Sequence, residues 1–183
     1  YQRSRGLGDV YKRQMLNGRT ICLRNIDVKK IFELIDKYDV THFGGAPIVL
    51  NMITGAPESD RKKLKQKVYV LTAGAPPPSI IFKKMKELGF EVMHVYGLTE
   101  TYGHVTQCAW NDSWNEFDEE KQNEIKARQG VRYPNTEGIT VMDPETMKEV
   151  PKDGKTIGEI MIKGNVVMKG YCLLYTSPSP RDR

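Results

Sequence analysis

Three side chains that suit nucleotide chemistry stand close together in the segment Tyr96-Gly97-Leu98-Thr99-Glu100-Thr101. A tyrosine ring can stack on a purine, a threonine hydroxyl can donate a hydrogen bond to a phosphate oxygen, and a carboxylate is a hard oxygen ligand of the kind that Mg²⁺ prefers beside phosphates. We expect this segment to be a loop that binds a nucleotide. The alternative is an ordinary helix start, with Thr99 as the cap and Glu100 in an acidic first turn.

The elements around this segment predict a β-α-β unit. Residues 68–72 and 90–95 are strand-like, and a helical pattern lies between them from Ser79 to Leu88, with its apolar side at Ile80, Ile81, Met85 and Leu88. Strands joined by a helical crossover are parallel, so the turn Gly74-Ala75-Pro76 and the segment 96–101 should leave the sheet at one edge. Open α/β sheets bind ligands at that edge.

The remaining sequence indicates an α/β fold: a layered, mostly parallel sheet with helices, followed by a β-rich segment. An amphipathic helix is expected over 27–38, a strand over 40–45, and a further helix from Pro47. Residues 111–126 are polar and carry five carboxylates whose spacing does not fit a calcium loop, so we expect an exposed loop and helix there. From Glu137 onward short strands and turns follow, including 138–142 and 158–164.

Three ordered matches, namely Gly74-Ala75-Pro76, the segment 96–101 and the strand 158–164, resemble the AMP-forming acyl-CoA synthetases of the adenylate-forming superfamily. The resemblance covers residues 15–171 and implies an internal fragment of the large N-terminal domain. It implies ATP or AMP and Mg²⁺ as ligands, with Glu100 as the metal ligand and Thr99 and Glu100 as the catalytic residues. The implied nucleotide contacts are Gly74, Ala75, Pro76, Tyr96, Gly97 and Thr99.

The resemblance also implies a pocket for the acyl group and a reaction. The pocket walls would be His42, Phe43, Gly44, Val95, Leu98, Tyr102 and Gly103. A carboxylic acid, expected to be a fatty acid, would react with ATP to give an acyl-adenylate, and CoA would then displace AMP. A phosphate loop and a catalytic lysine of the family are not found in this sequence, so we expect the chain alone to be inactive. The alternatives are a non-catalytic AMP-binding or interaction module and the adenylation domain of a peptide synthetase.

The two ends of the chain match neither the family nor a fold pattern. Residues 1–14 and 172–183 resemble translated sequencing adaptors, and we expect them not to be native. The chain has a net charge of +5, but these tails contribute +3 and +1 of it, which leaves +1 and argues against a nucleic-acid partner. The lysine runs at 61–67 and 83–86 are expected to be solvated helix faces.

Composition sets a few further limits. The chain has 183 residues, 39% of them hydrophobic, which suits a domain with a buried core. No apolar run is long enough for a transmembrane helix, and the three cysteines have no disulfide or metal spacing. We therefore expect a cytoplasmic protein without a transmembrane segment.

Overall fold

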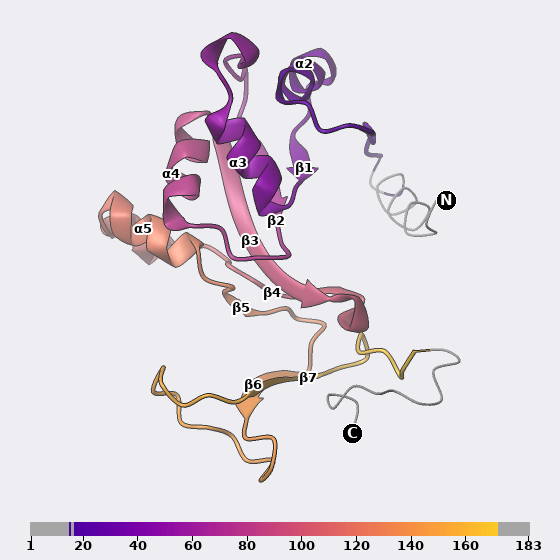
Figure 1. Cartoon of the computed structure of the whole chain (residues 1–183), viewed down its shortest axis with the longest axis vertical. Coiled ribbons are helices and arrows are strands. Elements are labelled where there is room, and N and C mark those ends of the chain that lie inside the picture. Colours follow the sequence, from indigo (N-terminus) through magenta and orange to yellow (C-terminus); the bar gives the residue numbers. More distant parts are fainter. Residues whose placement is uncertain (1–14, 16, 172–183) are drawn as a thin grey trace.

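The computed structural model describes residue 15 and residues 17–171. The tails expected at 1–14 and 172–183 lie outside the described residues. An α/β layer makes up the first part of the described chain, and a small two-stranded sheet follows it (Figure 1).

The main sheet has five strands in the order β1-β2-β3-β4-β5. Its first three strands are parallel and the last two are antiparallel: β1 (His42–Gly44), β2 (Val68–Thr72), β3 (Phe90–Leu98), β4 (Gly103–Gln107) and β5 (Val131–Arg132). The second sheet is the antiparallel pair of β6 (Gly138–Met142) and β7 (Glu159–Lys163). This arrangement confirms the predicted α/β fold and the β-rich segment after it.

The helices are α2 (Val28–Tyr38), α3 (Pro47–Gly55), α4 (Ser79–Glu87) and α5 (Glu119–Lys126), with short 3-10 turns at η1 (Glu58–Asp60), η2 (Thr99–Thr101) and η3 (Asp112–Glu116). Aspartate side chains cap the starts of α2 and α5. The Asp27 carboxylate accepts the Lys30 N–H at 3.0 Å, and the Asp118 carboxylate accepts the Lys121 N–H at 2.8 Å. Each bond satisfies one of the backbone donors that a helix start leaves without an intrahelical partner.

The hydrophobic core lies between the sheet and helices α2, α3 and α4. Burial alternates along β2, so Val68 and Val70 face the helices while Tyr69 is 47% exposed on the other face. Phe90 at the start of β3 packs against Phe32 of α2, with ring centroids 5.8 Å apart. The core therefore fixes the start of β3 at Phe90. The other end of this strand leads into the predicted nucleotide segment.

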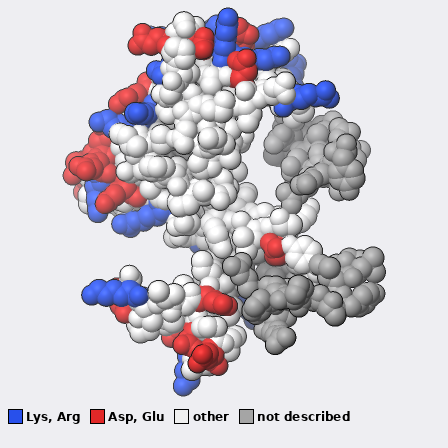
Figure 2. Space-filling model, viewed as in Figure 1, with Lys and Arg blue, Asp and Glu red and all other residues white. Residues whose placement is uncertain are grey.

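Two details of the helix predictions are wrong. Helix α4 buries Ile81 and Met85 as predicted, but it also buries Phe82, at 3% exposure, and leaves Ile80 52% exposed, because the side that packs on the core is rotated toward Phe82. Residues 61–67 are not helical and form the connection from η1 to β2. Figure 2 shows charged side chains at the top, along the left edge and at the bottom of the view, and a largely uncharged surface over the centre.

Candidate functional site

The turn after β2 and the end of β3 leave the sheet at the same edge. In the parallel register Thr72 lies beside His94, so both chains continue in the same direction from adjacent positions. Gly74 has φ +96°, a backbone conformation that L side chains rarely adopt. Ala75 and Pro76 are exposed. The fold thus places the Gly74-Ala75-Pro76 turn at the edge where the sequence predicted it.

The predicted loop over 96–101 begins later than expected. Tyr96, Gly97 and Leu98 belong to β3, which pairs antiparallel with β4 and has a register shift between Tyr96 and Gly97. A Cβ built on Gly97 would lie 2.0 Å from the Gly103 carbonyl oxygen and 2.4 Å from the His104 Cα. The strand continues because Gly97 lets the β4 backbone approach this closely.

A single 3-10 turn, η2, then reverses the chain. The Thr101 hydroxyl accepts the Leu98 N–H at 3.0 Å and donates to the Gly103 carbonyl at 2.8 Å. Thr101 is only 4% exposed, and Tyr102 completes the reversal with φ +56°. Since η2 ends after three residues, the alternative of an ordinary helix start is wrong.

Both the backbone and the side chain of Glu100 accept hydrogen bonds from the segment that follows β7. The Glu100 carbonyl accepts the Met168 N–H at 2.8 Å, and its carboxylate accepts a hydrogen bond from the Tyr171 hydroxyl. The Tyr171 hydrogen bond is the main reason that the pKa of Glu100 lies below its ordinary value. The sequence analysis missed both partners, because they lie about seventy residues away along the chain.

The donor chemistry of η2 fits a magnesium ion bound together with phosphates. Mg²⁺ in such sites takes one or two carboxylates and fills its other positions with water and substrate phosphates. Glu100 supplies one carboxylate, and Thr99 beside it is exposed. Among the described residues, no group of three or more His, Cys, Asp or Glu side chains could hold a metal ion by protein ligands alone.

The residues predicted for the acyl pocket fall into two groups. His42 and Phe43 line a cavity of about 590 Å³, where the His42 ring stacks on Tyr69 at a centroid distance of 5.0 Å. The others named for this pocket do not line that cavity: Gly44 on β1, Val95 within β3, and Leu98, Tyr102 and Gly103 at the β3–β4 turn. Val95 is 1% exposed, whereas Tyr102 is 78% exposed.

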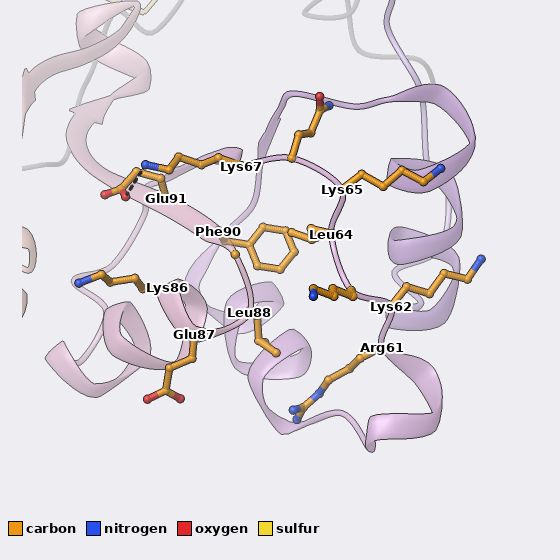
Figure 3. A pocket seen from close by; sticks show the side chains of 13 residues that line it. Arg61, Lys62, Leu64, Lys65, Lys67, Lys86, Glu87, Leu88, Phe90 and Glu91 are labelled. Atoms are coloured by element: carbon orange, nitrogen blue, oxygen red, sulfur yellow. Dashed lines mark ion pairs between the residues drawn. The ribbon is translucent and has the colours of Figure 1, made fainter.

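A second hollow, of about 600 Å³, lies away from the nucleotide segment, at the amino ends of β2 and β3 (Figure 3). Its lining is rich in lysine, and several of these cations have carboxylate partners within the described structure. Lys62 and Lys65 pair with Asp36, and Lys67 pairs with Glu91. We therefore interpret this hollow as a charged surface that stabilises the connection into β2.

A comparison with known protein families decides the family. Residues 14–172 match the family described as AMP-binding enzyme. This chain belongs to that family. The match confirms the resemblance to adenylate-forming enzymes that the nucleotide segment indicated.

Named relatives fall among acyl-CoA ligases. The chain is 52% identical over 159 residues to Acetate/butyrate--CoA ligase AAE7, peroxisomal, of Arabidopsis thaliana, covering 86% of this chain and 28% of the relative. It is 53% identical over 156 residues to Acetate--CoA ligase CCL3 of Humulus lupulus, covering 84% of this chain and 27% of the relative. The chain thus spans less than a third of the length of these relatives.

Solved structures agree on the fold. The structure of O-succinylbenzoate Coenzyme A Synthetase from Bacillus subtilis in complex with ATP and magnesium ion has a TM-score of 0.67 at 22% identity, covering 91% of this chain and 31% of that one. The structure of the N-terminal domain of FACL13 from Mycobacterium tuberculosis has a TM-score of 0.67 at 25% identity. The match covers 90% of this chain and 38% of that one. None of the helices in the described part of our chain is long and apolar enough to cross a membrane.

Proposed function

We propose that residues 15–171 are the AMP-binding part of an ATP-dependent carboxylate–CoA ligase. The observation that carries the proposal is that the Gly74 turn and the end of β3, which carries Tyr96 and leads into the β3–β4 turn, leave the sheet at one edge. The family match and the ligase relatives support it. They do not favour the alternatives of a non-catalytic module or a peptide-synthetase adenylation domain.

The proposed reaction has two steps. A carboxylate oxygen attacks the α-phosphorus of ATP while the bond to pyrophosphate breaks, which gives the acyl-adenylate. The CoA thiol then attacks the acyl carbon, loses its proton, and the bond to AMP breaks. In the first step two anions meet, so the site must offer oriented donors and positive charge.

Residues of the β3–β4 turn have separate roles in this proposal. The Tyr96 ring stacks on adenine opposite the small side chains of Gly74 and Ala75, and the Thr99 hydroxyl donates to the α-phosphate. Glu100 holds Mg²⁺, which supplies charge neutralisation at the phosphates when bound. The close approach at Gly97 and the Thr101 hydroxyl fix the turn that carries these groups.

For the substrate, we narrow the expected fatty acid to a short one. The names of two relatives give acetate or butyrate and acetate as their acids, and a third, from Humulus lupulus, is named 2-methylpropanoate--CoA ligase CCL4. The cytoplasm stays the sequence prediction for the compartment, while Acetate/butyrate--CoA ligase AAE7 is described as peroxisomal. We also propose that the 183-residue chain by itself forms no acyl-CoA.

Calorimetric titration of the chain with AMP tests the site. We expect weak binding by the unaltered chain and a loss of roughly 5- to 160-fold in Tyr96→Ala, because stacking of a base on an aromatic ring contributes about 1–3 kcal/mol. Tyr69→Ala is the matched control, since this half-exposed tyrosine lies near the start of β2, at the opposite end of the strand from the Gly74 turn. Equal AMP affinity in both variants would contradict the proposed adenine site, and acyl-CoA made from acetate, ATP and CoA by the chain alone would contradict its inactivity.

A further inference from the structure

The segment after β7 returns to the β3–β4 turn and ends against Glu100. Residues 164–171 follow β7 directly, and the Met168 N–H reaches the Glu100 carbonyl at 2.8 Å. Three residues later, the Tyr171 hydroxyl donates to Oε1 of the Glu100 carboxylate. In Figure 1 this yellow segment runs beside the 3-10 turn at the end of β3.

These two contacts constrain different parts of the same residue. The backbone bond fixes where the Glu100 main chain sits relative to the returning segment. The side-chain bond fixes how the carboxylate is turned, because a phenol hydroxyl donates to one carboxylate oxygen along a restricted direction. A glutamate on a surface turn otherwise samples several rotamers, and ordering it has an entropic cost at the moment of binding.

We propose that Tyr171 is a positioning residue that orients the Glu100 carboxylate for a divalent cation bound together with the nucleotide phosphates. The inference rests on the proposed function, because it assumes that Glu100 is the metal ligand. Carboxylates that bind metals are themselves hydrogen-bonded, and loss of such an outer partner lowers metal affinity by about 10- to 100-fold. Tyr171 holds Glu100 in this way without itself binding the ion.

The test measures Mn²⁺ binding to the 183-residue chain by electron paramagnetic resonance, with and without saturating AMP. Tyr171→Phe keeps the ring and removes the hydroxyl, Glu100→Gln removes the charge, and Tyr38→Phe on α2 is the matched control. We expect AMP to raise the Mn²⁺ affinity of the unaltered chain. Tyr171→Phe should lower the AMP-dependent affinity about tenfold, Glu100→Gln should abolish it, and Tyr38→Phe should leave it unchanged.

Metal-free AMP affinity provides the second readout. It should be the same in Tyr171→Phe as in the unaltered chain, because positioning of the metal ligand does not act on the base. If Tyr171→Phe weakens AMP binding equally with and without Mn²⁺, Tyr171 has only a structural role and the inference is overturned.

The two proposals fail in different ways. If Glu100→Gln loses Mn²⁺ and Tyr171→Phe binds it as the unaltered chain does, the inference about Tyr171 is overturned while the proposed function stands. If AMP has no effect on Mn²⁺ binding by the unaltered chain, the assignment of Glu100 as metal ligand fails, and the role of Tyr171 fails with it.

Discussion

Replacing Gly97 by alanine should separate β3 from β4. The added methyl group would lie 2.0 Å from the Gly103 carbonyl oxygen and 2.4 Å from the His104 Cα, and both are backbone atoms. Ordinary van der Waals contact begins at about 3.4 Å, so the two strands must move apart by more than an ångström locally. Overpacking of side chains costs about 1–3 kcal/mol, and we expect at least about 3 kcal/mol here because backbone cannot change rotamer.

Urea unfolding followed by far-ultraviolet circular dichroism measures this loss of stability. Gly44→Ala is the matched control, because its nearest neighbour would be the Leu71 carbonyl oxygen at 3.8 Å, an ordinary contact. We expect Gly44→Ala to stay within about 0.5 kcal/mol of the unaltered chain, as substitutions that strain nothing usually do. A free energy of unfolding for Gly97→Ala within that same range would refute the close approach of β3 and β4.

Three further outcomes follow from caps and charges. Asp27→Ala should lower the free energy of unfolding by about 1 kcal/mol by removing the α2 cap, measured by urea unfolding, and an unchanged midpoint would contradict the cap. Lys126→Ala should cost about 1–2 kcal/mol because this lysine, which pairs with Glu91 at 2.5 Å, is only 15% exposed. Lys121→Ala in an exposed pair should cost under about 0.5 kcal/mol, and similar values for the two variants would refute that contrast. Hydrogen bonds from Thr156 and its neighbours lower the pKa of Asp153 from 3.8 to about 2, so this carboxylate stabilises the fold above pH 4 and loses that effect as the pH falls toward 2. Asp153→Asn should therefore show a smaller loss of stability between pH 5 and pH 2 than the unaltered chain does, and equal losses would show that the turn does not depend on this charge.

Local patterns predicted most of the elements that position the site. The strand at 68–72 was predicted with the bounds that β2 has, and Asp27 and Pro47 marked the starts of α2 and α3. The alternation of buried and exposed residues in a strand and the cap of a helix both depend on residues close together in sequence. They can therefore be recognised without knowledge of the tertiary structure. The helix phase at Ile80 was wrong because the neighbouring elements decide which face is covered, and they are set by tertiary packing.

The details of the candidate site depend on contacts between distant residues. Segment 96–101 looked like a loop because a glycine near a strand end usually marks a turn. Only the pairing with β4 shows that Gly97 continues the strand. Likewise, nothing near Tyr171 in the sequence indicates that its hydroxyl reaches Glu100. The acyl pocket depends on more surface than one motif describes, so its residues stay predictions.

The hydrogen bond between the Met168 N–H and the Glu100 carbonyl has a consequence for the order of folding. Contacts between residues far apart in sequence require closure of long loops and form late, while β2, α4 and β3 are consecutive and can pair early. During synthesis, the β2-α4-β3 unit would be complete on the ribosome before Met168 is made. Pulse-labelling hydrogen exchange during refolding should protect the Val70 and Met93 amides, which lie in the paired strands β2 and β3, before the Met168 amide, and simultaneous protection would contradict this order.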